Sequence, residues 1–192
     1  YEYNFKNDSN DVILIWRQKI THLRWAFWGC VNITHIDFSH FDSSSLIHMG
    51  GMVQFCASLK TVNFSNFNTK TVEYIDYIFA DCVSLISVDL SSFETSGIVD
   101  MEAMFYNCTS LQYINLKNFE ENATLNYEYI FKEISNNITV CINETKAPNL
   151  YQLIKNLNDS YIDCSDDWKL RPKVIKNEYN YSYITLRVKG IG

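Results

Sequence analysis

A 26-residue repeat sets the apolar positions across the middle of the chain. Four segments share one register: "FWGCVNITHIDFSHF", "VQFCASLKTVNFSNF", "FADCVSLISVDLSSF" and "FYNCTSLQYINLKNF". The shared apolar columns are Ile33, Leu59, Leu85 and Leu111; Ile36, Val62, Val88 and Ile114; Phe38, Phe64, Leu90 and Leu116; Phe41, Phe67, Phe93 and Phe119. Self-similarity at a period of this size is typical of a solenoid, in which stacked units bury a common core.

Each repeat has two halves with different apolar spacing. The first half, as in "SLKTVNFSNF", alternates apolar and polar residues at its centre, which predicts a short strand. The second half, as in "VEYIDYIFADC", has apolar residues at i, i+3, i+6, i+7 and i+10, which predicts a short helix. The sequence therefore predicts an α/β solenoid of strand–turn–helix units, with a parallel sheet on one face and short helices on the other.

Two segments carry a motif that is known from a protein family. "MFYNCTSLQYINLKNF" and "IFADCVSLISVDLSSFETSGIVDM" follow the form M-F-x-x-C-x-S-L-x-x-L-D-L-S-x-F-x-T-S-x-V-x-x-M. The motif resembles that of BspA-like leucine-rich repeat surface proteins, and the resemblance covers residues 12–142. It implies a leucine-rich repeat fold, a surface location in a bacterium or protist, a role in adhesion, and no enzyme site in the repeats.

One departure from the leucine-rich repeat concerns the backbone contacts at the end of the strand. The position that usually carries Asn or Cys is Phe in this chain. We expect Ser39, Ser65 and Ser91 to supply the contacts that Asn would otherwise make.

The domain organisation follows from where the repeat begins and ends. We expect an N-terminal partial repeat or cap over residues 1–29 and leucine-rich repeats over 30–134. Residues 135–192 are expected to hold the last strand, a disulfide-closed C-terminal cap and a tail. In this part, "APNLYQLIKNLNDSYIDC" predicts an amphipathic helix after Pro, and "YNYSYITLRV" predicts one more strand.

The six cysteines fall into two classes. Four of them keep the apolar register of the repeat: Cys30, Cys56, Cys82 and Cys108. We expect these to be buried, reduced thiols, because their spacing does not suit zinc and parallel side chains in neighbouring layers do not point at one another. Cys141 falls in an outward strand position, so we expect it to form a disulfide with Cys164 that closes the cap.

Alternation along the predicted strands leaves one polar face outward. Its members are His35, Asp37, Thr61, Asn63, Ser87, Asp89, Tyr113 and Asn115. Solenoids often bind ligands on such surfaces, and Tyr113 is the one aromatic residue available as an anchor. Asp37 and Asp89 could also hold a cation, although we favour a solvated face.

Composition and charge exclude several functions. The net charge is −6 without a basic stripe, which disfavours nucleic-acid binding. No apolar run reaches the ~18 residues that a membrane span needs. The four His residues and the Gly50–Gly51 pair form neither a catalytic constellation nor a phosphate loop. We therefore expect no enzyme activity, no metal and no cofactor.

Nine N-x-S/T sequons favour a secreted or cell-surface glycoprotein. They begin at Asn7, Asn32, Asn63, Asn107, Asn122, Asn137, Asn143, Asn158 and Asn180. The start at "YEYNFK", without Met, is what we expect of a domain from a longer protein.

Two functions fit these features. The first is adhesion, through binding of a protein or glycan ligand. The second is a structural repeat module of a large glycosylated surface or filament protein, with neighbouring domains of that protein as partners. An intracellular scaffold is a third, weaker alternative.

Overall fold

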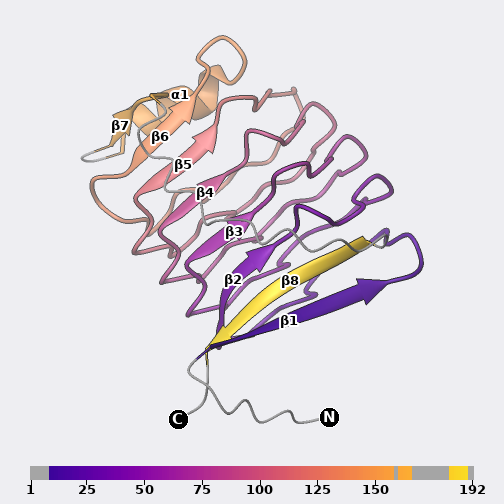
Figure 1. The fold of residues 1–192 in the computed structure, drawn as a ribbon. Coiled ribbons are helices and arrows are strands. Elements are labelled where there is room, and N and C mark those ends of the chain that lie inside the picture. Colours follow the sequence, from indigo (N-terminus) through magenta and orange to yellow (C-terminus); the bar gives the residue numbers. More distant parts are fainter. Residues whose placement is uncertain (1–8, 158–159, 166–181, 190–192) are drawn as a thin grey trace.

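The computed structural model describes residues 9–157, 160–165 and 182–189, and it is a solenoid of parallel β-structure (Figure 1). One helix lies within these ranges, α1 (Pro148–Lys155). The strands are β1 (Ser9–Trp16), β2 (Ile33–Asp37), β3 (Thr61–Asn63), β4 (Ser87–Asp89), β5 (Tyr113–Leu116), β6 (Thr139–Ile142), β7 (Tyr161–Ile162) and β8 (Ser182–Lys189). Their order in the sheet is β1-β8-β2-β3-β4-β5-β6-β7.

The sheet keeps the register of the repeat. Strands β2 to β7 are parallel, and Ile36 pairs with Val62, which pairs with Val88. These side chains are buried, as the apolar alternation predicts. Strand β8 returns to the N-terminal end of the stack, where it lies antiparallel between β1 and β2 (Figure 1). A strand from the end of the chain thus covers the first layer.

The second half of each repeat is a run of tight turns, so the predicted helices on one face are wrong and the fold is a β-solenoid. Gly51 and Val53 donate their N–H groups to the carbonyls of Asp76 and Ile78 in the next layer, at 2.8 and 3.1 Å. The intervening Met52 donates to Met49 within its own layer. A helix would direct every N–H back along its own segment.

Left-handed residues explain why this segment is not helical. They recur every 26 residues in two columns: Trp25, Gly51, Tyr77, Ala103 and Tyr129; and Gly29, Phe55, Asp81, Asn107 and Glu133. Their φ values lie between 50° and 68°, whereas helical residues have negative φ. Eight of the ten, all except Tyr77 and Glu133, take the third position of a hydrogen-bonded four-residue turn, where type II turns require positive φ.

The helix-like spacing in the sequence has a simple origin in these turns. Overlapping turns start two residues apart, as at Met49, Gly51 and Val53. Their buried side chains nevertheless recur at intervals of three, one and three residues, as those on one face of a helix do. Ile75, Ile78, Phe79 and Cys82 are all buried in the core. The apolar pattern therefore identified the core residues correctly and the element incorrectly.

Stacked phenylalanines fill the core between the sheet and the turns. Ring centroids of Phe67 and Phe93 lie 5.8 Å apart, and those of Phe79 and Phe105 lie 5.5 Å apart, with nearly parallel rings in the second pair. Stacking continues from Phe105 to the next layer. Because the layers share one register, equivalent rings of neighbouring layers meet in these pairs. Such aromatic pairs stabilise the core beyond the effect of the area that they bury.

Buried hydroxyl groups connect the layers at the turn that follows each strand. Thr69 accepts a hydrogen bond from the N–H of Glu94 at 2.8 Å and donates to the Glu94 carbonyl at 2.9 Å. Ser43 and Thr95 lie in the same column and are also buried. This column, and not Ser39, Ser65 and Ser91, makes the contacts between layers that we expected of those serines.

The column of hydroxyls ends in an acidic residue that caps the helix. Glu121 follows Thr95 by 26 residues, and its carboxylate accepts the N–H groups of Asn149 and Leu150 at 3.1 and 2.6 Å. The N-cap residue Ala147 makes no side-chain cap of its own. A carboxylate at a helix N-terminus satisfies free donors and favours the helix dipole. Glu121 therefore helps to seat α1, whose Leu150 and Ile154 are buried, over the last layer.

The cysteines behave as two classes, as expected. Cys141 and Cys164 form a disulfide, and the other four are free thiols. Cys56 donates through Sγ to the Phe27 carbonyl of the preceding layer at 3.0 Å, and Cys82 and Cys108 repeat this contact at 3.1 Å. Burial raises the pKa of Cys56 and Cys108 to about 12 and that of Cys82 well above its usual value.

Cys30 differs from the other three thiols, because it lies in the first layer and is only half-buried. Burial also raises its pKa.

The Phe column can be tested with two Phe substitutions. Phe93 is fully buried, whereas Phe55 is 42% exposed. We expect Phe93→Ala to lower the free energy of unfolding by ~3–5 kcal/mol, because it opens a cavity within a stack of rings. Phe55→Ala should cost less than ~1 kcal/mol. Chemical denaturation measures both, and equal losses in the two variants would contradict the stacked core.

Thiol reactivity tests the cysteine column. The thiolate is the reactive form, so a pKa of about 12 leaves it scarce at pH 8. Under native conditions we expect a maleimide to label Cys30 first, while Cys56, Cys82 and Cys108 react only after denaturation. Peptide mass spectrometry resolves the four sites. If Cys82 were labelled under native conditions as fast as Cys30, the thiols of this column would be accessible to the reagent and the prediction would be wrong.

Candidate functional site

The polar strand face is less accessible than the sequence suggests. His35, Asp37, Thr61, Asn63, Ser87 and Asp89 are half-buried. Tyr113 and Asn115, at the C-terminal side of this face, are only 7% and 8% exposed. Tyr113 is therefore not the exposed anchor that we expected.

The acidic and amide residues of this face hold the turns that follow the strands. Asp37 accepts hydrogen bonds through Oδ1 from the N–H of Ser39 at 2.8 Å and from Nδ2 of Asn63 at 2.9 Å. Asn63 and Asp89 accept the N–H groups of the residues two positions later in the same way. Asp and Asn commonly cap turns with this contact. Turn formation explains the column, and no group in the described ranges has the arrangement of a metal site.

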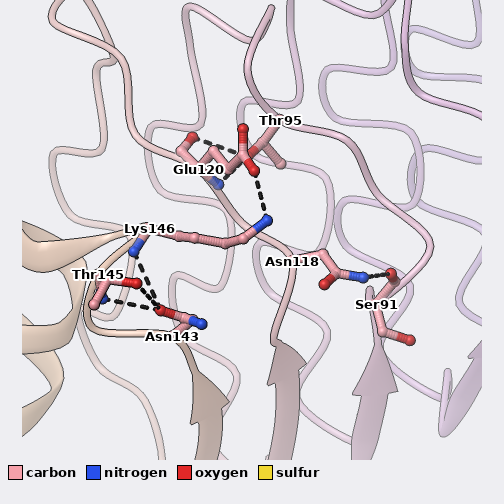
Figure 2. A network of polar contacts seen from close by, with 7 residues as sticks. All are labelled: Ser91, Thr95, Asn118, Glu120, Asn143, Thr145 and Lys146. Atoms are coloured by element: carbon pink, nitrogen blue, oxygen red, sulfur yellow. Dashed lines mark hydrogen bonds and ion pairs between the residues drawn. The ribbon is translucent and has the colours of Figure 1, made fainter.

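A polar groove of about 380 Å³ lies beyond the C-terminal ends of β4 and β5. Figure 2 shows the network of contacts around it, which comes from three successive layers. The groove is lined by Ser91, Ser92, Phe93, Glu94, Thr95, Ser96, Asn118, Glu120 and Lys146. Hydroxyl, amide and charged groups thus face one hollow on the edge of the stack.

The floor of the groove is fixed by the buried hydroxyl column. Thr95 is 1% exposed, accepts the N–H of Glu120 at 2.7 Å and donates to the Glu120 carbonyl at 3.0 Å (Figure 2). Ser92 donates to the Phe64 carbonyl of the preceding layer at 2.9 Å. These contacts connect the backbone that lines the groove to the layers on both sides.

The rim carries the groups that a ligand would meet first. Lys146 forms an ion pair with Glu120 at 2.6 Å, and both side chains are exposed by more than a third. Asn118 donates through Nδ2 to the Ser91 carbonyl at 2.6 Å (Figure 2). No described residue bonds to Oδ1 of Asn118 or to the Ser96 hydroxyl. These groups can serve as acceptor and donor for a polar ligand.

Small side chains create the groove, and the sequence held a signal for it. The turn "SSFETSG" has Ser92 where neighbouring repeats have His40, Asn66 and Asn118. Ser96 and Gly97 are also small, whereas the preceding layer has Lys70 and Thr71 at the equivalent positions. The strand pattern predicts nothing about this turn, so the groove was not among the predicted sites.

The sequons divide between described and undescribed residues. Asn7, Asn158 and Asn180 lie outside the described ranges. Of the remaining six, Asn137 and Asn143 are exposed, and Asn32, Asn63, Asn107 and Asn122 are half-buried. Within the described ranges, no helix is long and apolar enough to cross a bilayer.

The repeats of this chain match a known protein family. Residues 19–143 match the family described as "Mycoplasma protein of unknown function, DUF285". The chain belongs to this family. The match spans the repeats from the first turn run to the turn after β6, so the DUF285 domain contains the groove lining except for Lys146. No curated protein and no solved structure matches the chain.

The buried hydroxyl of Thr95 allows a test of the groove floor. Thr95→Val keeps the shape and leaves the N–H and carbonyl of Glu120 without their partner, so we expect a loss of ~1–3 kcal/mol in unfolding free energy. Thr95→Ser keeps the hydroxyl and loses one methyl group, at a cost of ~0.8 kcal/mol. Urea denaturation compares the two. A Val variant more stable than the Ser variant would mean that packing, and not hydrogen bonding, fixes the floor.

Proposed function

We propose that this chain is a non-enzymatic, extracellular or cell-surface domain that binds a glycan in the groove between residues 91–96, Asn118 and Lys146. The observation that carries the proposal is the lining itself, in which hydroxyl, amide and ion-pair groups converge on a hollow of about 380 Å³. That volume lies at the small end of ligand sites, ~300–1,000 Å³. Adhesion through terminal sugars of a larger glycan is the function that this size favours.

The chemistry of the lining favours a sugar. Sugar hydroxyls both donate and accept hydrogen bonds, and the Ser hydroxyls and the Asn118 amide offer the same two capacities. Neither His nor Cys is among the described lining residues, and Lys146 pairs with Glu120. The lining therefore suits hydrogen bonding to a sugar better than it suits catalysis.

Two further features support a surface location. The Cys141–Cys164 disulfide is of a kind that persists in oxidising compartments, and the chain carries nine sequons. The repeats also resemble those of BspA-like leucine-rich repeat proteins, for which adhesion at the cell surface is the expected role. We extend this role to the chain as part of the proposal.

A structural module is the second candidate. It is favoured by the strand face, whose Asp and Asn side chains hold turns and whose Tyr113 and Asn115 are buried. In that case, the domain would space its neighbours within a larger surface protein, and the groove would have no ligand.

Glycan binding can be tested by filling the groove. Ser96 lines it and is exposed, and Ser44 is exposed at the equivalent position two layers away. We expect the full chain to bind a subset of a glycan array, and Ser96→Trp to weaken binding by at least ~10-fold, or ~1.4 kcal/mol. Ser44→Trp, the matched control, should bind like the parent.

Two results would contradict the proposal. The first is a folded parent chain that binds no glycan on the array, which would favour the structural module. The second is equal binding by the two Trp variants, which would place the ligand elsewhere on the surface.

A further inference from the structure

The six described sequons differ in how exposed their three residues are and in whether the Asn Nδ2 is already hydrogen-bonded. From this comparison we infer that Asn143 is an attachment site for an N-linked glycan. This inference concerns a covalent modification and goes beyond the proposed ligand binding. In four of the six sequons the central residue is buried: Ile33, Phe64, Cys108 and Ile138. A transferase that acts on the folded chain and must hold all three residues could not do so there without pulling a side chain out of the core.

The repeat explains two of these sequons without any glycan. Asn63 shares its column with Asp37 and Asp89, and each of the three caps the equivalent turn of its own layer. The Nδ2 of Asn63 also donates to Asp37 at 2.9 Å. Asn107 is at a left-handed position that Asn tolerates well, and its Nδ2 donates to Asp81 at 2.9 Å. Turn formation therefore accounts for the Asn residues of these two sequons.

The sequon at Asn122 has exposed neighbours, but its Asn side chain is occupied by contacts within the protein. Its neighbours Ala123 and Thr124 are exposed. Its Nδ2, however, donates to the carbonyls of Ile98 at 2.7 Å and Ser96 at 3.3 Å in the preceding layer. The nitrogen that would carry the sugar thus faces the protein.

Asn143 meets the conditions that the other five fail. Asn143, Glu144 and Thr145 are all exposed, and Thr145 stands where the repeat has its buried Phe column. Oδ1 of Asn143 accepts hydrogen bonds from the N–H and hydroxyl of Thr145, at 2.9 and 2.7 Å, and from the N–H of Lys146 at 3.3 Å. No described residue accepts from its Nδ2, which carries no contact in Figure 2.

The surroundings suit this chemistry. Asn143 follows Cys141 by two residues, and the disulfide of Cys141 is of a kind found in secreted proteins, in which sequons are modified.

The co-reactant of the glycosylation step is an oligosaccharide activated at its anomeric carbon by a diphosphate. Nδ2 attacks that carbon, a C–N bond forms, the C–O bond to the diphosphate breaks and the diphosphate leaves with the electron pair. Nδ2 gives up one proton to a base of the transferase.

A glycan on Asn143 would also affect the groove. Lys146 lines the groove and lies in the same turn as Asn143 (Figure 2). Because the sugar would project from the turn that carries Lys146, we expect it to limit the size of ligand that can enter. This consequence rests on the proposed binding function, whereas the modification itself does not.

Occupancy can be measured on the full chain secreted from eukaryotic cells behind a secretory leader, by glycopeptide mass spectrometry. We expect a glycan on Asn143 and none on Asn63 or Asn107. Thr145→Ser keeps the sequon and should keep the glycan, whereas Thr145→Ala should lose it with an unchanged thermal midpoint. A bare Asn143, or equal occupancy of all six described sequons, would overturn the inference.

The effect on the groove is measured separately. The parent and Thr145→Ala, both from the same cells, are compared on the glycan array, and the bare variant should bind larger glycans at least ~10-fold more tightly. A glycosylated Asn143 with no array binding by either form would sustain the modification and end the proposal for the groove.

Discussion

Hydrogen bonds between successive layers are the interaction on which the structure depends. Alternate amides of each turn run donate to the next layer, as in the contact from Val53 to Ile78. This pattern works only if equivalent residues lie directly above one another, which requires the same repeat length in every layer. The same constraint places Phe rings of neighbouring layers against one another and places each Thr hydroxyl beside a backbone carbonyl of the next layer. The aromatic core and the hydroxyl column therefore both follow from one register. Buried backbone groups are thereby satisfied without helices.

The sequence revealed the register but not the backbone that carries it. Apolar columns, the two classes of cysteine and the Cys141–Cys164 pair could all be read from spacing, because spacing decides which side chains meet. The turn runs could not, because overlapping turns and helices place apolar residues at almost the same period. Aromatic residues such as Trp25 and Phe55 at left-handed positions hid the turns further, since such positions usually carry Gly or Asn.

The same limit applies to the site. Strand alternation placed Asp37 and Asp89 outward correctly, yet it could not show that their carboxylates hold the following turns. The groove depends on small side chains in one turn and on Lys146 from a later layer, and only the fold brings these together. Positions at which the side chain departs from its repeat column, such as Glu121 and Asn143, take on roles that the periodicity does not assign.

The most direct test of the layered backbone is an NMR measurement of couplings through hydrogen bonds. In a uniformly labelled chain, the amide nitrogen of Val53 should couple to the carbonyl carbon of Ile78, in the next layer. If the segment were helical, Val53 would couple instead to Met49, four residues earlier. Detection of the Val53–Ile78 coupling would support the β-solenoid, and detection of the Val53–Met49 coupling would contradict it.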